Sequence, residues 1–438
     1  MEKLFNLQKH GTTVQRELMA GLTTFLTMAY ILAVNPGMLS GRMAGLESMV
    51  GMPWGGIFTA TALSAAIATL VMAFAANLPV ALAPGMGLNA FFVFTVVVKM
   101  GYPWQLALTA VFLEGILFIV LSIFNVREAI VNAIPTNLKK AVAVGIGLFI
   151  ALIGFSNSGI IIGGGGTILG LGNLSNPGIL LALIGLVIII VLYSLKVPGA
   201  ILIGILGTTL IGIPMGITNI PQGWKPFDVP AAPLLFKFDF SKILSFEFFT
   251  VFFTFLFVDI FDTVGTLVGV TTQAGLIDKN GNIPRLKQAF LSDAVGTVAG
   301  AALGTSTVTS YVESTAGVAA GGRTGLTALS TGVLFLLALL FSPVFLLIPG
   351  SATAPALIFV GFLMMAPVAD IDFKDPTIGI PAFMSIVMMP FAYSIADGIV
   401  YGILTYVILK AVTGKFKDIP VVTWVLFIIF ILRFLLKK

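Results

Sequence analysis

Long apolar segments follow one another along almost the whole chain, and they restrict its fold more than any other feature. A helix that crosses a bilayer needs about 20 apolar residues, and its backbone polar groups must all be hydrogen-bonded inside the bilayer. Of the 438 residues, 58% are hydrophobic and only 9% are charged, whereas soluble domains carry about 25% charged residues. The sequence therefore predicts an all-α polytopic membrane protein.

Mostly short polar loops separate the apolar segments, and the segments provide about 14 spans of bilayer-crossing length. Their approximate bounds are 18–37, 57–76, 84–99, 104–124, 138–155, 178–194, 199–218, 246–270, 288–303, 311–321, 325–347, 353–369, 378–392 and 395–412. Under this count Lys139, Lys196 and Lys287 fall on one side, which their positive charge marks as cytoplasmic. We expect a multi-pass protein of the cell membrane (the inner, or cytoplasmic, membrane) with both ends in the cytoplasm.

The apolar tail 420–438 allows two interpretations. It could form a further short span, or it could form a helix that lies on the membrane surface. We favour the surface helix, because a further span would place the basic residues Arg433, Lys437 and Lys438 on the outer side.

Two segments interrupt the regular pattern at matching positions in the two halves of the chain. Asn77 to Phe92 reads NLPVALAPGMGLNAFF, and Gly304 to Gly322 reads GTSTVTSYVESTAGVAAGG. Each is an extended piece that runs into a helix, and Thr305, Thr307 and Thr309 fall on one side of the second piece. Because the two segments are seven spans apart, an odd number, the halves must be inverted. Broken segments at matching positions of inverted halves indicate the midplane site of a transporter.

Carboxyl groups within apolar segments are the other rare feature, because ionisable residues in a membrane are costly and usually functional. These residues are Glu114, Asp259, Asp262, Asp293, Glu313 and Asp397. Asp259 and Asp262 share a helix face that Thr263 extends. That face is too polar to meet lipid, so it lines a cavity or makes hydrogen bonds between helices. We interpret Glu114, Asp293 and Asp397 as structural.

Protonation and hydrogen bonding suggest roles for the remaining polar residues. Burial of a carboxyl group favours its protonated form, so proton handling is expected at Glu313 and Asp259. Asn89 has amide donors and an acceptor at the start of a half-helix, so it could hold a substrate or cap the helix. Phe91 could offer a flat apolar face to a ring.

Several classes of function are excluded by composition. There is no cysteine, hence no disulfide, thiolate metal site or cysteine nucleophile. The single histidine, His10, lies in the polar N-terminal segment, and no nucleophile–base pair indicates an enzyme. We therefore expect no catalytic residues, no metal and no cofactor. The net charge of +5 is carried by loops and does not indicate nucleic-acid binding.

Four stretches resemble the AzgA-like purine permeases of the nucleobase–ascorbate (xanthine/uracil permease) superfamily. They are ELMAGLTTFLTMAYIL from Glu17, APGMGLNAFF from Ala83, VDIFDTVGTLVG from Val258 and TSTVTSYVESTAGVAAGGRTGLTA from Thr305. The resemblance implies a 7+7 inverted repeat with extended pieces in spans 3 and 10. It implies a core domain of spans 1–4 and 8–11 and a gate domain of spans 5–7 and 12–14. The corresponding bounds are core 1–134, gate 135–244, core 245–348, and gate 349–438 with the C-terminal helix.

The resemblance also implies a function. It is that of a secondary active transporter that takes up purine nucleobases (hypoxanthine, guanine and adenine) by symport with H⁺ rather than Na⁺, the core moving against the gate. By motif match the substrate contacts are Asn89, Asp259 and Glu313, with Asp262 and Thr263 as second choices to Asp259. Further candidates are Phe91 and Thr309, and a homodimer through the gate domain is allowed for.

The alternative is a carrier of the same 7+7 fold for another small solute or an anion. The acidic residues of the expected site argue against a strongly anionic substrate, because like charges repel. The sequence leaves open which purine is preferred.

Overall fold

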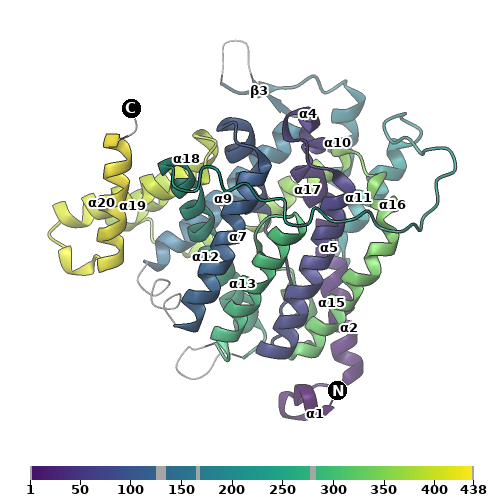
Figure 1. Ribbon diagram of the computed structural model, residues 1–438, viewed down its shortest axis with the longest axis horizontal. Helices are drawn as coiled ribbons and strands as arrows, with labels where there is room; N and C mark the ends of the chain where they lie inside the picture. Colours follow the sequence, from purple (N-terminus) through teal and green to yellow (C-terminus); the bar gives the residue numbers. More distant parts are fainter. Residues whose placement is uncertain (1, 125–134, 164–167, 277–282, 437–438) are drawn as a thin grey trace.

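Helices form most of the computed structural model, which describes residues 2–124, 135–163, 168–276 and 283–436 (Figure 1). The α-helices are α1 (Glu2–Phe5), α2 (Val14–Met28), α3 (Ile31–Leu39), α4 (Glu47–Val50), α5 (Trp54–Val71), α6 (Met86–Ala90), α7 (Trp104–Ile123), α9 (Thr136–Asn157), α10 (Pro177–Ser194), α11 (Ala200–Gly212), α12 (Phe246–Gln273), α13 (Leu286–Leu303), α14 (Ser314–Ala319), α15 (Gly325–Ala338), α16 (Ser342–Leu346), α17 (Gly350–Leu363), α18 (Pro376–Phe391), α19 (Ile395–Val412) and α20 (Val421–Leu436). Wider π-helical segments are η3 (Met72–Ala76) and η4 (Phe91–Lys99), and the short 3-10 helices are η1 (Gln8–His10), η2 (Arg42–Ala44), η5 (Leu339–Phe341), η6 (Ala366–Asp370) and η7 (Phe416–Asp418). The strands are β1 (Leu82–Pro84), β2 (Ile161–Ile162), β3 (Gly170–Leu171) and β4 (Val308–Ser310).

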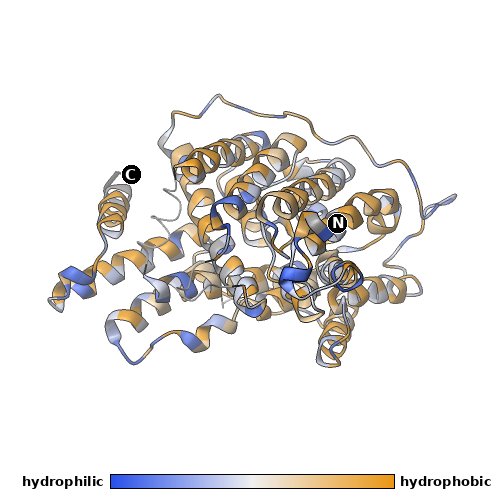
Figure 2. Cartoon of the chain, turned by 90° about the horizontal axis from the view of Figure 1, so that it is seen from below, coloured by the Kyte–Doolittle hydropathy of each residue, from blue (hydrophilic) through white to orange (hydrophobic). Residues whose placement is uncertain are grey.

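The helices include many that could span a membrane. Within the described ranges, eight helical stretches are long and apolar enough to cross: Val14–Leu39, Trp54–Ala76, Trp104–Ile123, Thr136–Asn157, Pro177–Ser194, Gly325–Leu346, Gly350–Asp370 and Ile395–Val412. Shorter apolar helices add Met86–Lys99, Ala200–Gly212, Pro376–Phe391 and Val421–Ile431. Most of the helical ribbon consists of hydrophobic residues (Figure 2). The prediction of a polytopic α-helical membrane protein is confirmed.

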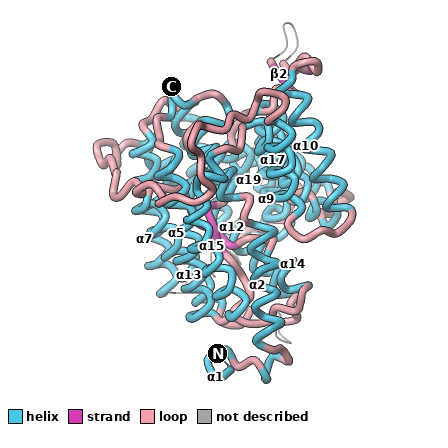
Figure 3. The backbone as a smooth tube through the Cα atoms, turned by 90° about the vertical axis from the view of Figure 1, so that its right-hand side faces the viewer, coloured by secondary structure: helices cyan, strands magenta, loops and turns pink. Residues whose placement is uncertain are grey.

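The two predicted extended pieces are present, and they pair with each other. β1 and β4 are antiparallel, with Leu82 opposite Ser310, Ala83 opposite Thr309 and Pro84 opposite Val308. The short strands lie deep among the helices (Figure 3). Every residue of both strands is buried, so pairing satisfies backbone groups that could not reach water.

A threonine from a neighbouring helix completes each strand in the same way. The Thr69 hydroxyl of α5 donates to the Leu82 carbonyl (3.1 Å) and accepts from the Leu82 N–H (2.9 Å). The Thr297 hydroxyl of α13 makes the same pair of bonds with Val308, at 3.1 and 3.2 Å. The two halves therefore use equivalent contacts to hold their extended pieces.

Close packing of α5 on α13 brings these threonines to the strands. A Cβ atom added at Gly296 would lie 2.5 Å from Cβ of Ala68, so the helices approach there only because residue 296 has no side chain. Thr69 and Thr297 are the next residues along their helices. Gly296 thus permits the helix contact on which the hydrogen bonds of Thr69 and Thr297 to the strands depend.

Two sets of helices surround this centre. In one, α13 packs against α5 and α7, and α15 packs against α2 and α5. In the other, α9 packs against α17 and α18, α18 against α19, and α10 against α11 and α17. β1 packs against α5, β4 against α13 and α14 against α2, all of the first set, whereas α6 packs against α9 of the second set.

The first predicted span, 18–37, is not one uninterrupted α-helix. It is divided between α2 and α3, and the backbone at the junction uses tighter bonds from Leu32 N–H to Ala29 C=O and from Ala33 N–H to Tyr30 C=O. Polar side chains near this junction face the centre of the molecule, as the site below shows.

The C-terminal segment forms helix α20, which follows η7 and packs against α19 (Figure 1). Lys437 and Lys438 lie outside the described residues. The surface position of this helix and the cytoplasmic placement of both chain ends stay predictions.

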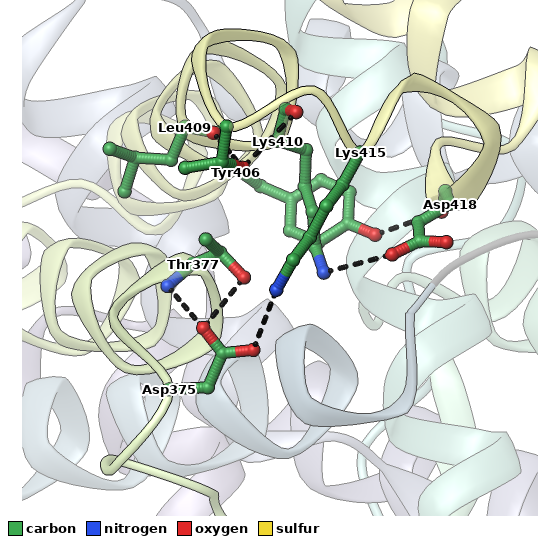
Figure 4. A network of polar contacts seen from close by, with 8 residues as sticks. Asp375, Thr377, Tyr406, Leu409, Lys410, Lys415 and Asp418 are labelled. Carbon is green, nitrogen blue, oxygen red and sulfur yellow. Dashed lines mark hydrogen bonds and ion pairs between the residues drawn. The ribbon is translucent and has the colours of Figure 1, made fainter.

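A polar network fixes where α20 begins (Figure 4). Lys410 of α19 pairs with Asp418 of η7 at 3.3 Å, and Lys415 pairs with Asp375, the N-cap of α18, at 3.5 Å. Hydrogen bonds from the side chain and N–H of Thr377 hold the pKa of Asp375 below its ordinary value. The Lys415–Asp375 pair is partly exposed, and exposed pairs contribute only about 0–1 kcal/mol, so this pair positions the connection more than it stabilises it.

We predict that Thr69→Val and Thr297→Val each lower the free energy of unfolding by about 1–3 kcal/mol, because each leaves a buried strand N–H and C=O unpaired. The matched control is Thr208→Val, since the buried Thr208 hydroxyl, among the residues that the structure describes, bonds only to Gly204 C=O of its own helix. The thermal unfolding midpoint in detergent should fall for the first two variants and stay near the parent value for the control. Equal midpoints for all three variants would contradict the role of Thr69 and Thr297 in stabilising the strands.

Candidate functional site

Glu313 lies where β4 ends and α14 begins, and it faces the junction of α2 and α3. Its Oε1 accepts a hydrogen bond of 2.5 Å from the Tyr30 hydroxyl, and its carbonyl accepts one of 3.3 Å from the Thr27 hydroxyl. Tyr30 is fully buried, whereas Glu313 and Thr27 are partly exposed. The carboxyl group is thus held on one side by a phenol and open on another.

Asp262 of α12 lies beside the strand crossing. Its Oδ2 accepts a hydrogen bond of 3.2 Å from the Thr309 hydroxyl of β4, and its side chain is partly exposed. A Cβ atom added at Gly85 would lie 2.9 Å from Thr309 Oγ1 and 3.5 Å from Asp262 Oδ2. Gly85, directly after β1, therefore leaves space for this contact.

Tyr30, Asp262, Thr309 and Glu313 form one group, which we call the crossing site. The charges of Asp262 and Glu313 act on each other and on the Tyr30 hydroxyl. Two carboxyl groups and two hydroxyls thus converge where the two broken segments meet. Such a set can accept several hydrogen bonds from an N–H-rich solute.

Asn89 of α6 lies on the other side of the crossing. Its Oδ1 accepts a hydrogen bond from the Ser306 hydroxyl, so the structure joins it to the second broken segment. The side chain is fully buried, yet Nδ2 has no hydrogen-bond partner among the described residues. A buried donor without a partner costs about 1–3 kcal/mol, a cost that a bound acceptor would remove.

Asp259 and Thr263 belong to a second group. The Thr263 hydroxyl lies 3.2 Å from Asp259 Oδ1 and 3.0 Å from Asp293 Oδ1 of α13. We call these three fully buried residues the buried triad. The preferred candidate Asp259 thus lies in the triad, and Asp262, the second choice, lies in the crossing site.

Phe91 lies beside α12. Its ring packs edge-on against Phe255 of α12, with 4.9 Å between centroids, and only 2% of the residue is exposed. It lines a cavity with Thr95, Thr250 and Asp397. This position joins Phe91 to α12 and α19.

The sequence interpretation missed Tyr30, Ser306 and the pairing of Asp293 with Thr263. Tyr30 lies within the first predicted span, 18–37, and nothing local to it pointed to a residue 283 positions away. A metal centre is not indicated, because no group of three or more metal-ligating residues occurs among the described residues.

Comparison with known proteins identifies the family. Residues 15–429 match the permease family. This chain belongs to that family. It is 48% identical over 434 residues to a permease of Methanocaldococcus jannaschii, covering 99% of this chain and 98% of the relative. It is 44% identical over 437 residues to the adenine permease AdeQ of Escherichia coli (100% and 96% covered), and 44% identical over 447 residues to the guanine/hypoxanthine permease PbuG of Bacillus subtilis (100% of each).

The fold of this permease is also found among solved structures. The transmembrane domain of a cyanobacterial bicarbonate transporter, BicA, superimposes with a TM-score of 0.63 at 15% identity, covering 89% of this chain and 97% of that one. The family resemblance seen in the motifs is confirmed, and so is the prediction of a membrane transporter rather than an enzyme.

We predict different water access to the two groups of this permease. In a chain without native cysteine, Thr27→Cys next to Glu313 should react with a small hydrophilic thiol reagent, because Thr27 is partly exposed. Thr263→Cys in the buried triad should react far more slowly, because a buried thiol is inert. Labelling rates of the purified variants in detergent measure this. Similar rates at both positions would contradict the separation of the groups.

Proposed function

We propose that this permease takes up purine nucleobases together with protons. The observation that carries the proposal is the convergence of Asp262 and Glu313 at the crossing of two broken segments, in a chain similar over its full length to adenine and guanine/hypoxanthine permeases. Purines have ring N–H donors and N or O acceptors on their edges. Asp262 and Glu313 offer acceptors for the N–H groups, and the Asn89 amide offers a donor for the acceptors.

Each group of the site has a part in this proposal. Glu313 and Asp262 accept purine N–H groups, and such hydrogen bonds to charged groups contribute about 1.5–3 kcal/mol each. The Asn89 amide donates through Nδ2, which no described residue occupies. Thr309 orients Asp262, and Tyr30 holds Glu313. Substrate specificity follows from which purine edge satisfies both acceptors and the amide donor together.

The transport cycle of the proposal moves the core domain, which carries the site, against the gate domain in a 14-span, 7+7 inverted fold. The two observed sets of helices support this division. On the predicted outer side, Lys99 of η4 donates to the Ala392 carbonyl that follows α18, at 2.9 Å. Tyr393 packs edge-on against both Phe94 of η4 and Phe149 of α9. The contacts of Lys99 and Phe94 join the proposed core to the proposed gate, so movement must break them, whereas the contact with Phe149 lies within the proposed gate.

The alternative is transport of another small solute or an anion by the same fold. The bicarbonate transporter shares the fold, but its identity of 15% carries no substrate assignment. The two carboxyl groups of the crossing site oppose an anionic substrate. Neutral purines fit the site better.

We predict that purified protein in sealed vesicles exchanges labelled adenine, guanine or hypoxanthine in counterflow. In sodium-free medium an imposed pH gradient should drive accumulation, and a protonophore should abolish it without stopping counterflow. Absence of counterflow for all three bases would reject the purine proposal. Accumulation that follows a sodium gradient and ignores the protonophore would reject proton coupling alone.

We predict that Glu313→Gln weakens equilibrium binding of purines roughly 10- to 100-fold, since about 1.5–3 kcal/mol is lost with the charged acceptor. Asp262→Asn should weaken binding to a similar extent, because Asp262 lies in the crossing site. Asn89→Ala should cost less, about 0.5–1.5 kcal/mol, and change the order of preference among purines.

Asp259→Asn separates the two aspartates of α12. If Asp259 contacts the purine, this variant should lose more affinity than Asp262→Asn. Because Asp262 and not Asp259 lies in the crossing site, we expect Asp262→Asn to lose more affinity than Asp259→Asn. Binding to purified variants decides between them, and parent affinity in Glu313→Gln would remove Glu313 from the site.

A further inference from the structure

In the buried triad a single hydroxyl lies between two carboxyl oxygens. The Thr263 hydroxyl carries a single hydrogen, but its oxygen lies within hydrogen-bond distance of a carboxyl oxygen on each side, at 3.2 Å from Asp259 and 3.0 Å from Asp293. If both carboxyl groups were ionised, one of these short contacts would join an oxygen lone pair to a negative charge. A shared, three-centre bond would leave two charges facing a single hydrogen.

One additional proton removes the conflict. If one carboxyl group is protonated, it donates to Thr263, and Thr263 donates to the other, so that both contacts become hydrogen bonds of ordinary length. The proton can reside on either aspartate, so the pair titrates as a unit. The geometry is that of a site holding one proton between two carboxyl groups.

The surroundings of the triad contain few other ionisable groups. The side chains of α5 and η3, which pack on α13, include none. Glu114 of α7, which also packs on α13, accepts a hydrogen bond of 2.9 Å from Thr307. Asp262 lies on the same helix as Asp259, and Glu313 lies beyond it at the crossing.

Asp293 is electrostatically linked to the crossing site. Its charge acts on Asp262, whose Oδ2 accepts from Thr309. A negative charge on the triad opposes a negative charge on Asp262, and a proton on the triad relieves this repulsion. Protonation of the triad therefore favours the ionised Asp262 that accepts a purine N–H.

We propose that Asp259, Thr263 and Asp293 form the proton site of this permease, so that Asp293 couples proton uptake to substrate binding without touching the substrate. This rests on the proposed function for its substrate and adds a residue and a location for the proton. The proton binds to a carboxylate oxygen of the triad as the purine binds to the crossing site, and both leave on the other side of the membrane.

The test is the pH dependence of purine binding to purified variants. When one proton is taken up with the substrate, affinity falls about tenfold per pH unit above the range where the free site is protonated. The parent should show this slope. Asp293→Asn should flatten it, because the amide N–H donates to Thr263 in place of a protonated carboxyl group, so that Asp259 stays ionised and no proton is taken up. Vesicle accumulation driven by a pH gradient should fall more than counterflow.

Glu114→Gln is the matched control, since it neutralises another fully buried acidic residue, which accepts a hydrogen bond from Thr307 directly before β4. It should keep the slope of the parent. If Asp293→Asn does not fold, Thr263→Val decides: it preserves shape and both carboxyl groups but removes the bridge, so the pH profile should shift along the pH axis.

Each outcome bears on the proposal. A flattened slope in Asp293→Asn with a parent-like slope in Glu114→Gln supports it. A parent slope in Asp293→Asn overturns it, as does an unshifted pH profile in Thr263→Val where the first variant is unfolded. An equal loss of slope in Glu114→Gln overturns the assignment to the triad, and a parent without any slope overturns it as well. Failure of the parent to bind any purine would instead reject the proposed function.

Discussion

The pairing of β1 with β4 is the constraint on which the rest of this structure depends. An extended strand inside a bilayer leaves N–H and C=O groups that water cannot satisfy, and each such group costs several kcal/mol. Here each strand satisfies the other, and Thr69 and Thr297 satisfy the edges that remain. The crossing therefore requires both halves of the chain to be folded together, and it brings residues from both to one point.

The polar residues of the core are arranged around this crossing. Alternate side chains of the second extended piece meet different partners: Thr305 meets Asn35, Thr307 meets Glu114 and Thr309 meets Asp262. A segment with three hydroxyls on one side thus connects several helices of the core at once. A displacement of β4 would disturb all of these contacts together, which links the state of the site to the packing of the core.

Much of this architecture could be predicted from local sequence. The two extended pieces were recognisable because proline, glycine and alternating threonines break an apolar helical pattern within a few residues. The polar face of α12 was recognisable because residues three apart share a helix face. The sequence did not show that Asp259 and Asp262 of this face contact different partners. Asp259 and Asp262 differ in partner because α13 and β4 approach from different directions, and this depends on Gly296 meeting Ala68 across the molecule.

The contacts between the two sets of helices show where motion is restrained. Tyr393 adopts a positive φ of 52°, a conformation that is uncommon for a residue with a large side chain. The cost of that backbone is offset by edge-on contacts of its ring with Phe94 and Phe149, while the preceding carbonyl accepts from Lys99. If the first set of helices moves against the second, the ring loses Phe94 and the strained turn loses part of its support. The turn between α18 and α19 therefore favours the arrangement seen here, and any movement of one set of helices against the other must offset the free energy lost with these contacts.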